Sequence, residues 1–185
     1  HATGDVYINI ENLTGSDSHD VLIGDDNDNT LHGEGGNDEL YGGLGNDNLF
    51  GAQVCDKLFG EEGNDVLDAG MLLSGQQSAD TFDGGEGIDT VRYSHPYITA
   101  GVTVNLLTGS GESGEAHNDV YIRIENVVAT SYDDTIIGDN NNNYLFGLAG
   151  NDLLIGNAGD DSLDAGQGSD ILDGGLGRDY LKGGK

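Results

Sequence analysis

The sequence predicts an all-β fold, a parallel β-roll in which short strands and glycine-rich turns wind into a coil. Three features predict it: a nine-residue period, glycine at positions one, two and four of that period, and an apolar residue at position eight. The rows Gly42–Phe50 (GGLGNDNLF) and Gly174–Lys182 (GGLGRDYLK) show the full pattern. A phase held this regularly indicates a repeat architecture rather than an ordinary globular core.

The repeats fall into two arrays, which we expect to form two stacked blocks. The first covers residues 15–92 and carries an insertion, AGMLLS, at residues 69–74; the second covers residues 129–185. Between them, in residues 93–128, the alternating stretches 102–106 and 120–124 predict the strands of a short β linker. The segment DVYINIEN from Asp5 recurs as DVYIRIEN from Asp119, so residues 1–14 are interpreted as the tail of a preceding linker unit.

Each row divides into a turn of six residues and a strand of three. Glycines at positions one, two and four allow positive φ angles that side chains resist, and the last three residues are often apolar or β-branched. Two rows then make one coil of 18 residues, so that rows n and n+2 stack at the inter-strand spacing of about 4.8 Å. The position-eight residues, from Leu22 to Leu181, are expected to point inward and form a thin apolar core.

Acidic residues dominate the charge of the chain. Asp and Glu number 34 against six Lys and Arg, giving a formal net charge of -28, which disfavours nucleic acid and anionic lipid as partners. Low hydrophobicity with high net charge is also typical of disordered linkers, but a linker has no reason to keep a nine-residue phase. No stretch approaches the roughly 20 apolar residues of a membrane span, and the single Cys55 cannot form an internal disulfide.

Position six predicts metal binding. It is Asp in 12 of the 14 rows and Asn in the other two, Asn29 and Asn143. Stacked carboxylates about 5 Å apart repel by roughly 3 kcal/mol per pair at an effective dielectric of about 20. Ca²⁺ takes six to eight oxygen ligands in flexible geometry, whereas Mg²⁺ is smaller and loses its water reluctantly. We therefore expect the chain to fold only with Ca²⁺, binding about ten ions if every stacked pair of rows holds one.

These rows resemble the RTX repeats of proteins exported by type I secretion systems. The segment GVTVNLLTGSG (Gly101–Gly111), followed by IENVV (Ile124–Val128), is similar to the linkers between RTX blocks of adenylate cyclase toxins, epimerase-like proteins and large adhesins. The resemblance implies a non-enzymatic, calcium-binding module of a larger secreted bacterial protein. Such a module passes the type I machinery unfolded, folds in extracellular Ca²⁺ and acts as a folding and export scaffold. An adhesive module that binds carbohydrate or a cell surface is the alternative.

The resemblance also implies a ligand set for each ion. One row supplies the carbonyls of positions two and four and the carboxylate of position six; the row two later supplies the carbonyls of positions one and three and its own carboxylate. For the rows at Gly42 and Gly60 these are Gly43, Gly45, Asp47, Gly60, Glu62 and Asp65, and for the rows at Gly156 and Gly174 they are Asn157, Gly159, Asp161, Gly174, Leu176 and Asp179. The remaining candidate ligands are Asp20, Gly33, Gly35, Gly36, Asp38, Gly42, Leu44, Gly51, Gln53, Asp56, Glu61, Gly63, Asp80, Gly84, Glu86, Asp89, Asp134, Gly147, Ala149, Gly150, Asp152, Gly156, Ala158, Ala165, Gln167 and Asp170. Sites near Asn29, Asn143 and the insertion, and in the row that carries Gln53 and Val54, are expected to be weaker.

Other motifs predict no second activity. Residues 109–114 match GxGxxG, but a strand is expected where a dinucleotide site needs a helix. Residues 139–143 begin like an EF-hand loop, yet Tyr144 stands where that loop requires Gly. The histidines form no HExxH motif and no Ser lies in GxSxG, so we expect no catalytic residues.

Overall fold

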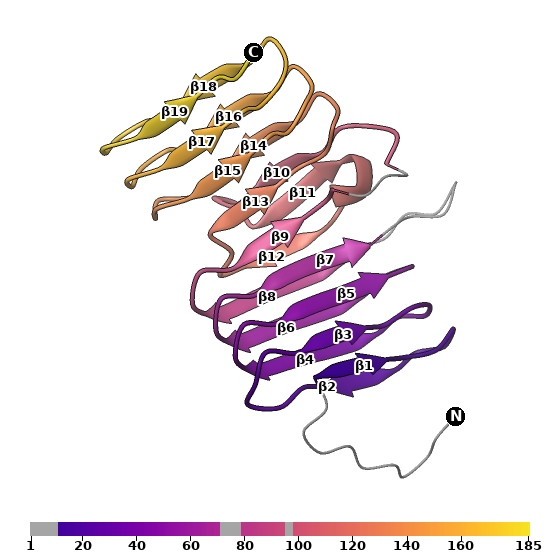
Figure 1. The fold of residues 1–185 in the computed structure, drawn as a ribbon. Helices are drawn as coiled ribbons and strands as arrows, with labels where there is room; N and C mark the ends of the chain where they lie inside the picture. The colour runs from indigo at the N-terminus through magenta and orange to yellow at the C-terminus, as the bar shows by residue number, and fades with distance from the viewer. Residues whose placement is uncertain (1–10, 71–78, 95–97) are drawn as a thin grey trace.

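The computed structural model describes residues 11–70, 79–94 and 98–185. Within these residues the chain is a roll of short strands that stack along one axis, from the N-terminal to the C-terminal end (Figure 1). Two sheets form its walls, and turns at both edges carry the chain from one sheet to the other. The predicted β-roll is confirmed.

The strands of the two sheets follow the nine-residue rows. The first sheet has the order β1 (Asn12–Thr14), β3 (Thr30–His32), β5 (Asn48–Ala52), β7 (Val66–Gly70), β9 (Thr90–Arg92), β13 (Asn126–Val128), β15 (Tyr144–Phe146), β17 (Ser162–Asp164) and β19 (Tyr180–Lys182). The second has the order β18 (Ile171–Asp173), β16 (Leu153–Ile155), β14 (Thr135–Ile137), β10 (Thr103–Asn105), β11 (Ser110–Ser113), β12 (Val120–Ile122), β8 (Thr81–Glu86), β6 (Lys57–Glu62), β4 (Glu39–Leu44) and β2 (Val21–Ile23). The described helical structure is a short 3₁₀ helix, η1 (Gly114–Ala116).

Parallel pairing of rows n and n+2 confirms the predicted coil. Thr30 of β3 pairs with Asn48 of β5, which pairs with Val66 of β7, so each step along the sheet is 18 residues. The next step, from Val66 to Thr90 of β9, is 24 residues because the insertion lies within it. Residues 69 and 70 of the insertion end β7, and residues 71–74 lie outside the described residues.

Residues 93–128 extend both sheets. β12 pairs with β8 and β13 pairs with β9, while β10 pairs with β14, all in parallel; β11 joins β10 to β12 through antiparallel pairing. Both sheets therefore run through the linker, and the division into two blocks stays a prediction. Of the tail predicted at residues 1–14, residues 1–10 lie outside the described part, and β1 begins the first sheet.

The strand predicted at residues 120–124 forms as β12 (Val120–Ile122), but its predicted extension to residue 124 was wrong. β12 ends at Ile122, Arg123 adopts a left-handed φ of 51°, and β13 begins at Asn126 in the other sheet. Here the alternation also gives the wrong buried face, since Tyr121 is buried whereas Val120 and Ile122 are exposed, and it cannot show that the chain must turn to reach β9. The resulting turn has three residues instead of six.

Position-eight side chains fill the space between the sheets. Leu31, Leu40 and Leu49 are fully buried, as are their counterparts in most other rows. Leu181 on β19 is 45% exposed, contrary to the expectation that every such residue is buried. β19 ends its sheet, so the described structure stacks no further strand upon it. The core is thus one side chain thick and depends on a neighbour on each side.

Glycine at position one serves a different purpose from the one predicted. Positions two and four have positive φ in the glycine-rich rows, for example 111° at both Gly43 and Gly45, but Gly42 at position one does not. A Cβ on Gly42 would overlap Oδ2 of Asp47 and lie 2.6 Å from the carbonyl oxygen of Gly60. Position one therefore requires glycine for space, because two oxygens face the position that a Cβ would occupy.

Replacing Gly42 with Ala tests this steric requirement. We expect Gly42→Ala to lose about 1–3 kcal/mol of folding free energy, the usual cost of overpacking, because the Cβ displaces the Asp47 carboxylate. Gly183→Ala is the matched control, since a Cβ there has no atom within 4 Å. Urea unfolding at a fixed, saturating Ca²⁺ concentration measures both variants. Equal stability of the two would contradict the assignment.

Candidate metal sites

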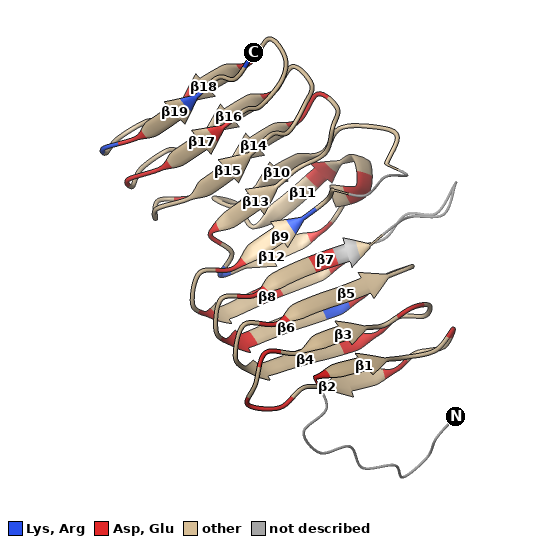
Figure 2. Cartoon of the chain, viewed as in Figure 1, with Lys and Arg blue, Asp and Glu red and all other residues tan. Residues whose placement is uncertain are grey.

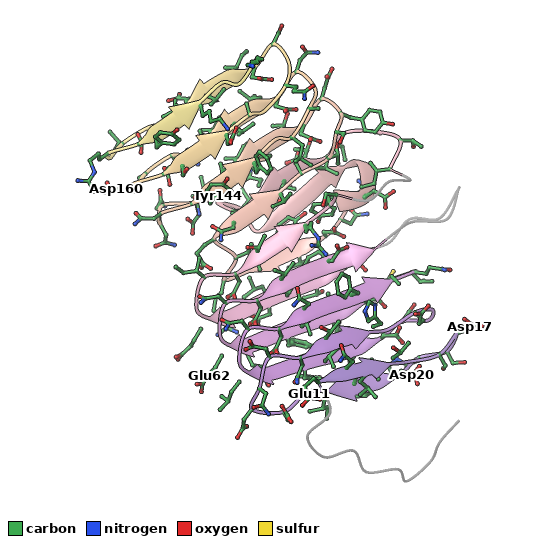
Figure 3. The ribbon with its side chains drawn as sticks, viewed as in Figure 1. Glu11, Asp17, Asp20, Glu62, Tyr144 and Asp160 are labelled. Atoms are coloured by element: carbon green, nitrogen blue, oxygen red, sulfur yellow. The ribbon has the colours of Figure 1, made fainter. Side chains whose placement is uncertain are left out.

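Position-six side chains form one column along each edge of the roll. At one edge the backbone N–H of Asp47 donates to Oδ1 of Asp65 at 2.7 Å, and that of Asp65 donates to Oδ1 of Asp89 at 2.8 Å. At the other edge Asp38 donates in the same way to Asp56 at 2.8 Å. The acidic residues accordingly gather at the turns (Figure 2). Glu62 and Asp160 lie along the first edge, and Asp17 and Asp20 lie on the opposite one (Figure 3).

The second carboxylate oxygen in most of these turns is buried and accepts no hydrogen bond from the described residues. Asp47 and Asp65 are each 1% exposed, and Oδ2 of each has no partner. The same holds for Oδ2 of the further position-six residues Asp38, Asp56, Asp89, Asp152, Asp161 and Asp170. An ionised oxygen buried in this way costs several kcal/mol unless a cation or a donor satisfies it. The turns therefore fit a hard cation that binds oxygen.

Burial also shifts the ionisation of these groups. Desolvation raises the pKa of Asp56 and of Asp89 to about 7, and that of Asp47 and Asp152 to about 6. Backbone hydrogen bonds oppose the shift, and neighbouring carboxylates such as Asp80 beside Asp56 add to it. The fold therefore favours the protonated form of these carboxyls relative to an unfolded aspartate, and a bound divalent cation would favour the ionised form again.

The backbone of the glycine-rich turns presents further oxygens. In the row at Gly156, Asn157 at position two and Gly159 at position four have φ of 73° and 126°, and Leu176 at position three of the row two later bridges to Ala158. The corresponding bridges Gly35–Gln53 and Ala149–Gln167 align other predicted carbonyl donors. Val54 takes a φ of 76°, which is strained for a β-branched residue. We name the rows with positive φ at positions two and four the glycine turns; they begin at Gly33, Gly42, Gly51, Gly60, Gly84, Gly147, Gly156, Ala165 and Gly174.

Four rows have a different turn that hydrogen bonds close internally. In the row at Gly15, Oδ2 of Asp20 accepts from the backbone N–H of Ser16 at 2.7 Å. In the row at Ala129, Oδ2 of Asp134 accepts from Thr130 N–H at 2.9 Å. The rows at Gly24 and Gly138 use Oδ1 of Asn29 and Asn143 in the same way. We name these four the closed turns; two of them open each array. Their signal in the sequence lies at position four, where Ser18, Asn27, Tyr132 and Asn141 replace the glycine that all glycine turns but one have.

The linker meets the two columns differently. At one edge Asp80 N–H donates to Oδ1 of Asp119 at 2.8 Å, and Oδ2 of Asp119 accepts from the hydroxyl of Tyr93 at 2.6 Å. The Tyr121 hydroxyl lies 2.6 Å from that of Tyr93. At the other edge Asp89 N–H donates to Oε2 of Glu125 at 2.8 Å. Sequence reasoning missed both Asp119 and Glu125, because neither stands at position six of a recognisable row.

The described residues gather no cluster of three or more His, Cys, Asp or Glu side chains. The stacked pairs with Asp at position six of both rows instead combine two carboxylates with turn carbonyls, a set of oxygens that suits Ca²⁺, which binds backbone and carboxylate oxygens together. It would not suit a soft or imidazole-preferring metal.

A comparison with protein families matches the model of the RTX calcium-binding nonapeptide repeat (4 copies) at residues 13–51, 56–71, 72–91, 123–154 and 146–181. The chain belongs to the RTX calcium-binding nonapeptide repeat family. No curated protein matches the chain. The resemblance inferred from the rows is confirmed, and the RTX repeats make this chain a calcium-binding module. Among the described residues, no helix of this RTX module has the length and apolar character to cross a bilayer.

Acidification tests the burial of the aspartates. An unfolded aspartate ionises near a pKa of about 3.9, whereas folded Asp56 and Asp89 keep their protons up to a pKa of about 7. Between these values the folded chain binds more protons than the unfolded chain, so stability falls as pH rises through this window. In metal-free buffer we expect the β-rich form to gain stability from about pH 8 to about pH 5. Thermal unfolding followed by circular dichroism measures it, and stability that rises with pH would contradict it.

Proposed function

We propose that this chain is a Ca²⁺-triggered folding module of a larger secreted protein, and that it acts as a scaffold for folding and export rather than as an enzyme. The observation that supports this proposal is the set of buried carboxylate oxygens without hydrogen-bond partners in the glycine turns. Without a cation these oxygens oppose folding, so metal binding and folding are one equilibrium. Where Ca²⁺ is scarce the chain stays extended and can be exported; where Ca²⁺ is abundant it folds.

The ions bind where a glycine turn is the first member of a stacked pair. These pairs begin at Gly33, Gly42, Gly51, Gly60, Gly147 and Gly156, and residues 75–78, which supply the second turn of the pair from Gly51, lie outside the described residues. The pairs whose first member is a closed turn are poorer sites, since hydrogen bonds already satisfy Oδ2 of Asp20 and both side-chain oxygens of Asp134. The expected stoichiometry within the two arrays is therefore about six ions rather than about ten.

An adhesive function has a specific feature in its favour. Tyr144 and Tyr180 are 42% and 64% exposed, and each pairs with Ser162 on the face of one sheet, two strands apart. Exposed aromatic rings at such a spacing suit contact with the apolar faces of sugar rings. Tyr41 on β4 does not offer such a ring, because it stacks on Phe59 with ring centroids 4.7 Å apart. Glycan-array binding that requires Ca²⁺ and is lost on Tyr180→Ala would support this second function.

Replacing Asp47 tests the principal proposal. Asp47→Asn preserves an acceptor for the N–H of Asn29 but removes the charge of the buried oxygen. We expect wild-type chain to gain β structure cooperatively over roughly 10⁻⁴ to 10⁻³ M Ca²⁺, and the variant to need roughly tenfold more. Circular dichroism titrated with Ca²⁺, and with Mg²⁺ in parallel, measures both midpoints.

The control for this experiment is Asp26→Asn, which removes the same charge from an exposed turn position. Its midpoint should stay close to the wild-type value, because a solvated charge contributes little to a site. Equal shifts in the two variants would mean that net charge alone sets the midpoint. A chain that is β-rich in metal-free buffer at neutral pH would contradict the proposed function.

A further inference from the structure

Glu125 occupies the place that a position-six aspartate takes in the repeats. β13 stacks on β9 with Asn126 opposite Thr90, so Glu125 lies opposite Asp89 in the same register that sets Asp65 opposite Asp89. The Asp89 N–H donates to Oε2 of Glu125 at 2.8 Å, as the Asp65 N–H donates to Asp89. The extra methylene of glutamate allows a side chain from a three-residue turn to reach the same contact.

Asp89 contributes an oxygen without a hydrogen-bond partner to the space between the row at Gly84 and the linker turn at residues 123–125. The residue is fully buried, and its Oδ2 accepts no hydrogen bond from the described residues. A Cβ on Gly84 would overlap both this Oδ2 and the carbonyl oxygen of Arg123. In the repeats, the corresponding Cβ on Gly42 would meet Oδ2 of Asp47 and the carbonyl oxygen of Gly60. The Arg123 carbonyl thus replaces the position-one carbonyl of a following row.

The row that begins at Gly84 has the backbone of a glycine turn. Gly85 and Gly87, at positions two and four, have φ of 103° and 146°. The corresponding residues of the row at Gly42 are Gly43 and Gly45, both with φ of 111°. The row at Gly84 therefore has the same turn as the first row of each site proposed within the arrays.

Neighbouring groups leave the two carboxylates available to a cation. The guanidinium of Arg123 pairs with Oδ1 of Asp83 at 2.5 Å, so that its charge is directed to another carboxylate. On the far side of Glu125 the next residue in the column is Asn143, whose side-chain N–H donates to the Glu125 carbonyl at 2.9 Å and which adds no charge. The family match also resumes at residue 123, within this turn and ahead of the array that starts at Ala129.

We propose a Ca²⁺ site between the last row of the first array and the linker turn, with Asp89 and Glu125 as carboxylate ligands and the carbonyl of Arg123 beside them. The carbonyls of Gly85 and Gly87 are the further ligands from the row at Gly84. This inference rests on the proposed function, since it extends Ca²⁺ binding from the repeats into a segment outside the nine-residue pattern. The site joins β13, and through it the second array, to the metal-dependent folding of the first.

The opposite edge of the roll provides an internal comparison. There the linker carboxylate, Asp119, accepts a hydrogen bond from Tyr93 and from the backbone of Asp80, so both of its oxygens are satisfied. The linker therefore closes one column with a hydroxyl group and leaves the other open to a cation.

Counting bound ions in Glu125→Gln tests the site. Glutamine retains an oxygen that accepts from Asp89 N–H, so the fold is preserved, but it removes the charged ligand. After equilibrium dialysis in Ca²⁺, metal analysis of the whole chain should show one ion fewer per molecule than wild type. Glu112→Gln, an exposed substitution in the same linker, is the matched control and should keep the wild-type number. An unchanged count in Glu125→Gln, or an equal loss in the control, would overturn the site and leave the proposed function standing.

A crystal of the wild-type chain grown with Tb³⁺ gives a reading that is independent of how the variant folds. We expect an anomalous peak at about 2.3–2.6 Å from Oδ2 of Asp89 and from the Arg123 carbonyl oxygen, the distances of a Ca²⁺-type ion. Peaks between the glycine turns of Asp47 and Asp65, with none between Asp89 and Glu125, would overturn this site alone. Failure of the wild-type chain to bind Ca²⁺ or Tb³⁺ at all would overturn both the site and the proposed function.

Discussion

A buried carboxylate oxygen without a hydrogen-bond donor is the constraint on which the rest of this structure depends. In every glycine turn except the one at Gly174, one oxygen of the position-six aspartate accepts a backbone N–H from the neighbouring coil, and the other is buried without a partner among the described residues, as in Asp47 and Asp65. Glycine at position one leaves the space beside that oxygen empty of side-chain atoms. Positive φ at positions two and four shapes the remainder of the turn. The same geometry that disfavours the folded chain by itself favours it with Ca²⁺.

The apolar core is too thin to offset this cost. Each row buries one side chain, such as Leu40 or Leu49, between the sheets, which contributes about 1.5–3 kcal/mol. Ordering the nine residues of a row costs more, at about 1–2 kcal/mol of backbone entropy per residue. Stability must therefore come from the edges of the roll. In the closed turns that open each array, Oδ2 of Asp20 and of Asp134 accepts a hydrogen bond without a cation, so these turns provide neighbours on which metal-dependent coils can stack.

The linker makes the arrays continuous. Its strands pair with the last strands of the first array and the first strands of the second, so both sheets pass through residues 93–128. At one edge the Tyr93 hydroxyl satisfies Asp119, and at the other Glu125 faces Asp89. A chain of coils in which each contacts only its neighbours transmits folding through such contacts alone. The chemistry at this junction consequently decides whether the two arrays fold as one unit.

The sequence by itself determined the β-roll, the stacking of rows n and n+2, the apolar position eight and the aspartates at position six, because a nine-residue period repeats one local environment many times. It also indicated Ca²⁺, since carboxylates at that period must stack. It could not show that position one needs glycine for space, that Oδ2 of Asp20 and of Asp134 accepts a hydrogen bond within its own turn, or that a strand ends before Arg123. Nor could it bring Glu125 to Asp89, 36 residues away. These features were decided by the tertiary structure, because each depends on which atoms of a neighbouring coil lie against the turn. The nine-residue period shows which positions face a neighbouring coil, but it does not show which atoms they contact there.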